Sequence, residues 1–192
     1  AMHEKKIRDE WPVLIAAMRN AKDRGFSPRD QVVQDLARHW IDLLRRSAME
    51  DPDTLHEYDG TRLLEPGYQS RNGIDIELFG YMSAALWAKH LGPDELQRLR
   101  PNGPKQREWP QLLSALRDEM NHGVSVSSPT VQQLFRRWES GLDELTAGDR
   151  ELRHKWLTAA RSDPALLAGA GIDIRLQNYL RRAHLAKSEC PA

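Results

Sequence analysis

The sequence predicts an all-α fold made of two tandem copies of one helical module, and three observations support this prediction. Residues 10–89 align without a gap on residues 108–187, with 26 identities in 80 positions at a constant offset of 98. Leu and Ala are abundant whereas Val, Ile and Thr are sparse, a composition that favours helices over strands. Apolar residues also recur at spacings of three and four, which is the period of an amphipathic helix.

The repeat sets the expected domain boundaries. Glu10-Trp11-Pro12 returns as Glu108-Trp109-Pro110, and two longer motifs follow at the same offset: Val33-Gln34-x-Leu36-x-Arg38-x-Trp40 as Val131-Gln132-x-Leu134-x-Arg136-x-Trp138, and Gly73-Ile74-Asp75-Ile76-x-Leu78-x-x-Tyr81 as Gly171-Ile172-Asp173-Ile174-x-Leu176-x-x-Tyr179. Biased composition does not produce matches at one constant offset, so a tandem duplication is predicted. We expect a first repeat at residues 9–91, a connection at residues 92–107 and a second repeat at residues 108–187.

The first helix of each repeat is expected to begin at the Glu-Trp-Pro motif, because the first turn of a helix tolerates proline. It is expected to end at Gly25 in one repeat and at Gly123 in the other. The second helix is expected after Ser27-Pro28 and after Ser128-Pro129, where a serine N-cap precedes proline at the first helical position.

Two further helices complete each predicted repeat. A third segment covers residues 51–64 and 149–162, and the last helix opens at Asp75 or Asp173, short acids that suit an N-cap. A short helical turn across Asp94–Leu99 is expected within the connection. Each repeat is therefore a unit of four or five helices.

The overall composition narrows the function classes. Lys and Arg total 28, as do Asp and Glu, so the net charge is zero and no basic surface for nucleic acid is expected. Cys190 is the only cysteine, which excludes a disulfide framework and a cysteine metal site and fits a cytoplasmic location. No apolar run approaches the ~20 residues of a membrane helix, so no membrane association is expected.

No motif for catalysis or for a cofactor is found. The chain has no His-Glu-x-x-His, no Gly-rich phosphate loop and no Gly-x-Ser-x-Gly elbow, so we expect a non-enzyme without catalytic residues, metal or cofactor. Only His56 and His154 are histidines at equivalent repeat positions, and one imidazole per repeat does not make a metal site by itself.

Aromatic residues are the stronger signal. Four of the six tryptophans occupy duplicated positions, namely Trp11 with Trp109 and Trp40 with Trp138. They can be core residues of an ordinary helical module, since large aromatic rings dominate packing. Alternatively, some of them line an apolar cavity for a drug-sized aromatic ligand.

The order, spacing and repetition of these motifs, Glu-Trp-Pro-x-Leu, Gly-x-Ser, Val-Gln-x-Leu-x-Arg-x-Trp and Gly-Ile-Asp-Ile-x-Leu-x-x-Tyr, resemble the TipAS family over roughly residues 9–187. These are the antibiotic-recognition domains at the C-terminal end of certain MerR-type transcription regulators, and the tandem arrangement is similar to albicidin-binding resistance proteins. The resemblance implies globin-like modules that bind hydrophobic antibiotics without catalysis, as the effector region of a regulator or as a stand-alone sequestering protein. The helix-turn-helix of the regulators is absent here, so no direct nucleic-acid binding is expected.

The expected ligand is a small antibiotic or another aromatic drug-like molecule, while its number per chain and the oligomeric state stay open. The expected contacts are the aromatic and histidine residues Trp40, His56, Tyr58, Tyr81, Trp138, His154, Trp156 and Tyr179. Their rings would stack on the ligand, and the imidazoles and hydroxyls would offer hydrogen bonds. Two alternatives compete: a helical protein-interaction scaffold without a small-molecule pocket, and a hydrolase or transferase, for which no nucleophile or acid–base pair is found.

Overall fold

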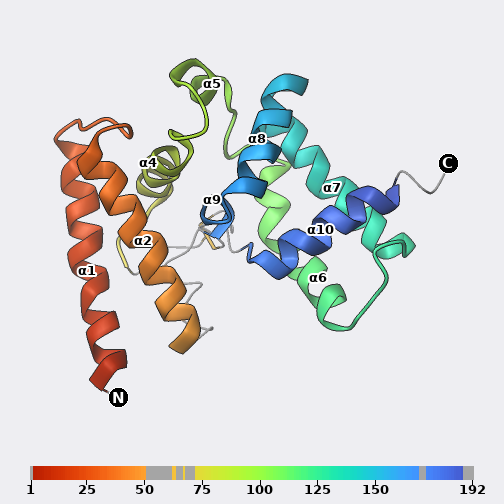
Figure 1. Cartoon of the computed structure of the whole chain (residues 1–192), viewed down its shortest axis with the longest axis horizontal. Coiled ribbons are helices and arrows are strands. Elements are labelled where there is room, and N and C mark those ends of the chain that lie inside the picture. The colour runs from red at the N-terminus through yellow and green to blue at the C-terminus, as the bar shows by residue number, and fades with distance from the viewer. Residues whose placement is uncertain (1, 51–61, 64–66, 68–71, 169–171, 188–192) are drawn as a thin grey trace. The chain divides into compact units, whose positions relative to one another are not determined.

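The computed structural model describes residues 2–50, 62–63, 67, 72–168 and 172–187, and every regular element within them is a helix (Figure 1). The all-α prediction is therefore confirmed for the described residues. The helices are α1 (Met2–Asp23), α2 (Gln31–Glu50), α4 (Ile76–Trp87), α5 (Pro93–Arg98), the 3-10 helix η1 (Gln106–Glu108), α6 (Trp109–Asn121), α7 (Pro129–Leu145), α8 (Arg150–Ser162), α9 (Ala165–Ala168) and α10 (Ile174–Lys187).

The chain divides into two compact units. The first unit comprises Ala1–Leu96 and Thr158–Gly171, and the second comprises Gln97–Leu157 and Ile172–Ala192. A boundary between them therefore falls within α8.

In the first unit, α1 and α2 pack side by side and α4 packs against both (Figure 1). The short helix α9 lies against α2 and α4. The side chains that are almost fully buried in this unit include Trp11, Leu14, Met18, Leu43, Leu78 and Met82. Their spacing of three and four along each helix places them on one face, which is why these helices form a layered core.

In the second unit, α6, α7 and α10 pack against one another, and η1 lies against α6 and α7. The core includes Leu116, Val131, Phe135, Leu142, Leu152 and Leu176. Ser128 caps α7, because its hydroxyl accepts a hydrogen bond from the Val131 amide at 3.2 Å, and Pro129 follows at the first helical position. The predicted start of this helix is confirmed.

Side-chain hydrogen bonds recur in the two units at the offset of 98. The Tyr81 hydroxyl donates to the Phe26 carbonyl at 2.8 Å, and the Tyr179 hydroxyl donates to the Val124 carbonyl at 2.9 Å. Asp75 accepts from the amide of Leu78 at 2.8 Å, as its counterpart Asp173 does from the amide of Leu176, also at 2.8 Å. Both aspartates therefore act as the predicted N-caps of α4 and α10.

Two helix starts in the first unit differ from the prediction. Helix α1 begins at Met2, so Pro12 lies inside the helix. Its buried face also includes Ile7, which precedes the Glu-Trp-Pro motif. Helix α2 begins at Gln31, and Pro28 lies in the turn before it. The reason is that the Asp30 carboxylate accepts a hydrogen bond from the Ser27 amide at 2.8 Å, which closes a turn before the helix.

The remaining predicted segments are only partly described. Helix α8 matches the segment predicted at residues 149–162, and α5 matches the short turn predicted in the connection. The corresponding first-repeat segment, residues 51–64, lies outside the described residues except for 62–63.

Candidate ligand-binding site

Six of the eight predicted contact residues lie in the described part of the chain. Trp40 and Tyr81 belong to the first unit, while Trp138, His154, Trp156 and Tyr179 belong to the second. His56 and Tyr58 lie outside the described residues.

In the first unit, the two predicted residues serve the packing of the helices. Trp40 on α2 is buried, and its ring meets Phe79 of α4 edge-on, with centroids 5.6 Å apart and planes at 89°. The Tyr81 hydroxyl is tied to the Phe26 carbonyl, and burial raises the pKa of this hydroxyl, with a smaller contribution from the charge of Asp30.

In the second unit, Trp138 lies in a stack of aromatic rings. Trp109 stacks on it with centroids 6.2 Å apart and planes at 25°, and Phe135 lies 5.8 Å away at 29°. His184 of α10 tilts against Phe135 at 6.1 Å and 59°. We call Trp109, Phe135, Trp138 and His184 the Trp138 stack. Aromatic pairs in such offset geometries add about 0.5–1.5 kcal/mol each beyond the burial of their area.

Helix α7 supplies the geometry of this stack. Phe135 and Trp138 are three residues apart, so both project from the same face of the helix. Gly141 lies one turn further on, and a Cβ atom there would stand 2.3 Å from Trp109 Nε1. The missing side chain therefore lets Trp109 lie directly on α7, where its Nε1 donates to the Trp138 carbonyl at 3.3 Å.

The indole nitrogen of Trp138 is the unusual atom of the stack. It is buried, and no described residue accepts a hydrogen bond from it. An unpaired buried N–H costs about 1–3 kcal/mol, because it loses its hydrogen bond to water without replacement. Trp40, the counterpart of Trp138, has no such unpaired buried nitrogen.

Charged side chains surround the imidazole of His184 in the stack. The Glu139 carboxylate is buried and lies 3.6 Å from His184 Nδ1, and it pairs with Lys187 Nζ at 2.8 Å. Arg153 of α8 pairs with the same carboxylate at 3.1 Å. This network fixes the orientation of the imidazole that faces Phe135.

The other predicted residues of the second unit do not share one role. Trp156 is buried, whereas His154, two residues earlier on α8, is exposed, since positions i and i+2 of a helix lie on different faces. The Tyr179 hydroxyl is tied to the Val124 carbonyl, and burial raises its pKa. The stack itself contains one predicted contact, Trp138.

The prediction of contact residues missed three members of the stack. Trp109 carried a signal, because it is a duplicated tryptophan at the start of a predicted helix. Phe135 could have been found from its helical spacing to Trp138. His184 carried no comparable signal, since its counterpart at the repeat offset is Leu86.

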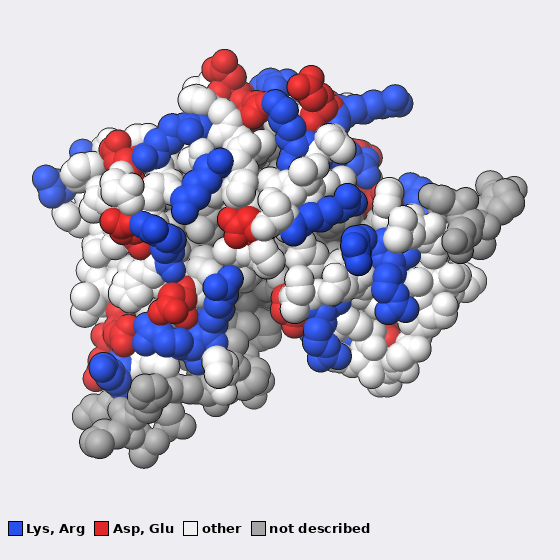
Figure 2. All heavy atoms as spheres, in the orientation of Figure 1, with Lys and Arg blue, Asp and Glu red and all other residues white. Residues whose placement is uncertain are grey.

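The described residues offer no metal site, because nowhere among them do three His, Cys, Asp or Glu side chains gather as ligands. On the face shown in Figure 2, basic and acidic side chains lie among one another and form no single basic stripe. None of the described helices has both the length and the apolar character needed to cross a membrane.

No protein-family model matches this chain, and no curated protein matches it. A functional assignment therefore depends on the sequence pattern and on the contacts described above. The feature that most needs a functional explanation is the Trp138 stack with its unpaired nitrogen.

Proposed function

We propose that this chain binds hydrophobic, aromatic drug-like molecules, antibiotics among them, and does not transform them chemically. It would act as the ligand-sensing effector region of a MerR-type regulator or as a stand-alone sequestering protein. We further propose that the two repeats are TipAS-like, globin-like modules. The observation that carries the binding proposal is the buried, unpaired indole nitrogen of Trp138 within a stack of aromatic rings.

The proposal of two related modules is supported by interactions that recur at the repeat offset. The hydroxyls of Tyr81 and Tyr179 donate to carbonyls at equivalent positions. The amides of Gln34 and Gln132 do the same, each donating to two backbone carbonyls. Identical residues therefore make identical long-range contacts, as two copies of one fold would.

Ligand binding at the stack requires a movement. Trp138 Nε1 is covered in this conformation, so a ligand acceptor reaches it only when some of the groups around it move. Trp109 is suited to move, because it is half-buried and its indole nitrogen makes a single long hydrogen bond to the chain. A ligand that replaces the Trp109 ring and accepts from Trp138 gains both stacking and a hydrogen bond that the free protein lacks. Such a ligand favours the open state and shifts the population towards it.

The test is a thermal-shift screen of the chain against natural-product antibiotics with several aromatic rings, followed by titration of the best ligand. A ligand at 100 times its Kd should add ~2.7 kcal/mol of stability. The Trp138→Phe variant keeps a ring but removes the N–H, and it should bind the ligand about tenfold more weakly because one hydrogen bond is lost.

The matched control is Trp40→Phe, at the equivalent position of the first repeat. It should leave the affinity unchanged while reducing stability by about 1–3 kcal/mol through loss of volume in the core. Trp138→Phe should be less destabilising than this control by about 1 kcal/mol or more, because it also removes an unpaired buried group. No shift with any ligand of the panel would contradict the proposal and favour the protein-interaction scaffold. If Trp138→Phe binds the ligand with the same affinity as the unmodified chain, the stack is not the binding site.

A further inference from the structure

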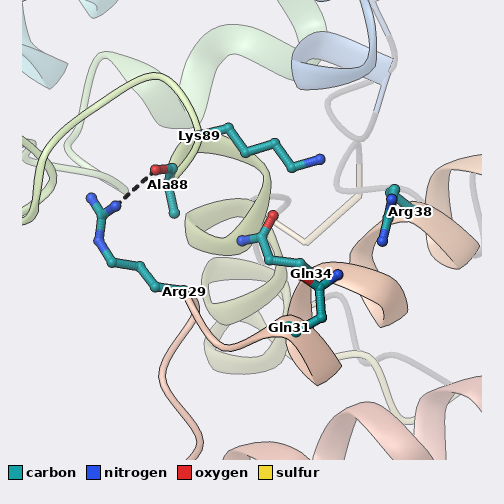
Figure 3. Close-up of a pocket in the computed structure, with 6 residues that line it drawn as sticks. All are labelled: Arg29, Gln31, Gln34, Arg38, Ala88 and Lys89. Carbon is teal, nitrogen blue, oxygen red and sulfur yellow. Dashed lines mark hydrogen bonds between the residues drawn. The ribbon is translucent and has the colours of Figure 1, made fainter.

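A polar hollow of about 310 Å³ opens in the first unit, between the start of α2 and the end of α4. Its lining comprises Arg29, Gln31, Gln34, Arg38, Ala88 and Lys89 (Figure 3). Half of these residues are cations, and none is a carboxylate. The hollow shares no residue with the Trp138 stack, so it needs an explanation of its own.

The three cations differ in how their charges are used. Arg29 is committed to the chain, since its guanidinium donates to the Ala88 carbonyl at 2.9 Å and to the Leu91 carbonyl at 2.6 Å. Arg38 pairs with Asp35 one turn earlier on the exposed face of α2. Lys89 makes no close ion pair among the described residues, but its charge acts on Asp35: the pKa of that carboxyl is lowered mainly by a hydrogen bond from Gln31, then by Arg38, with a smaller contribution from Lys89. Among the described residues, Asp35 is therefore the carboxylate whose charge acts on both Arg38 and Lys89, and it is exposed.

Gln34 supplies a fixed, polar floor to the hollow. Its side chain is buried, and its amide nitrogen donates to the carbonyls of Pro28 and Ala85, at 2.6 Å each. These two bonds fix the orientation of the amide, and Figure 3 shows the carbonyl oxygen on the side of Lys89. This oxygen accepts no hydrogen bond from the described residues.

In the second unit, the lysine equivalent to Lys89 pairs with a buried carboxylate. Lys187 lies 98 residues after Lys89, and its Nζ pairs with the buried Glu139 carboxylate at 2.8 Å. The residue equivalent to Glu139 in the first unit is Ile41, which is buried and apolar. The first unit therefore keeps the lysine without a buried carboxylate at the position of Glu139, and the carboxylate whose charge acts on Lys89 is the exposed Asp35.

We propose that this hollow binds the anionic group of a small molecule, a carboxylate or a phosphate monoester. Lys89 and Arg38 supply charge-assisted hydrogen bonds to the anion, as Lys187 does to the Glu139 carboxylate in the second unit. The Gln34 carbonyl oxygen accepts from an N–H or O–H next to the anionic group.

The test is a titration of the full chain with benzoate, phenyl phosphate and benzamide, followed through the backbone amide signals by nuclear magnetic resonance. Benzamide is the neutral analogue of benzoate, so it reports any binding through the ring alone. We expect saturable shifts around Gln31 and Lys89 with at least one of the two anions and none with benzamide. Binding of benzoate alone identifies a carboxylate site, binding of phenyl phosphate alone a phosphate site, and binding of both a general oxyanion site.

Two variants and one matched control locate the binding. Lys89→Gln and Arg38→Gln should each weaken the binding of the anion about tenfold, because each substitution removes one charged hydrogen-bond donor. Arg136→Gln changes the exposed second-repeat equivalent of Arg38 and should leave the affinity unchanged. The proposal is overturned if neither anion binds, if benzamide binds equally well, or if Lys89→Gln binds as the unmodified chain does. Trp138→Phe should not affect this titration, so failure here and failure of the proposed function remain distinguishable.

Discussion

Replacing Gly141 with alanine tests the close packing of Trp109 on α7. An alanine in an exposed helical position normally stabilises a helix relative to glycine by about 0.5–1 kcal/mol. At this position the new Cβ would lie 2.3 Å from Trp109 Nε1 and 2.9 Å from its Cε2, and real Cβ atoms do not approach so closely. The indole must move, which breaks its hydrogen bond to the Trp138 carbonyl and disturbs the stacked pair. Each of these two losses is worth about 0.5–1.5 kcal/mol, and overpacking adds to them.

The expected net effect of Gly141→Ala is a loss of about 1–3 kcal/mol in the free energy of unfolding, measured by urea denaturation. The near-ultraviolet circular dichroism of the tryptophans should change as well, because the stacked geometry is lost. The matched control is Gly80→Ala within α4, where an added Cβ meets no atom within 4 Å. That variant should gain about 0.5–1 kcal/mol from helix propensity alone. If Gly141→Ala is stabilising to the same extent, the described packing of Trp109 is wrong.

Three further results are expected from side chains with defined partners. Tyr81→Phe and Tyr179→Phe should each reduce stability by ~1 kcal/mol in urea denaturation, since each removes one hydrogen bond, and clearly unequal losses would contradict equivalent roles. Burial raises the pKa of both hydroxyls above the ordinary 10.0, so this stability is complete below about pH 10 and is lost as the pH rises through the folded-state pKa. The variant that carries both substitutions should therefore lose less stability as the pH rises above about 10. A hydrogen bond from Arg46 lowers the pKa of Glu10 below 4.5, so its contribution is present above that pH and is lost as the pH falls. Glu10→Gln should cost less than ~1 kcal/mol at pH 7 and reduce the acid dependence of stability, whereas unchanged acid dependence would exclude the pair.

Most of the fold follows from signals that are local in the sequence. Period and composition predict the helices, and a short acid or a serine before an apolar stripe predicts their starts at Asp75, Asp173 and Ser128. The start of α2 was misplaced because Ser27-Pro28 imitates the Ser128-Pro129 cap. At the constant offset of 98, however, the equivalent of Ser128 is Asp30, and α2 begins directly after it.

The membership of the Trp138 stack was harder to predict for a physical reason. Helical periodicity shows that Trp138 lies on the apolar face, but it does not show which neighbouring ring reaches it. That depends on the space left by Gly141, whose first-repeat counterpart is Leu43. Trp11 accordingly has a different partner from Trp109, since its nitrogen donates to the Ser47 hydroxyl at 3.1 Å. Identical tryptophans thus have different surroundings because the residues that face them differ.

Some residues of the repeat make the same interactions in both units, whereas others have different surroundings. The paired tyrosines, the paired glutamines and the helix-capping aspartates make the same hydrogen bonds in both units. Two of the many positions that differ concern the two binding sites proposed above. Gly141 in place of leucine admits the Trp109 ring, and Ile41 in place of glutamate leaves Lys89 without the buried carboxylate partner that Lys187 has. A duplicated fold that keeps its framework and changes these positions can present two chemically different surfaces, one aromatic and one cationic. One molecule that carries both rings and an anionic group has the chemistry to use either surface, and comparison of the Trp138→Phe and Lys89→Gln titrations shows which one it uses.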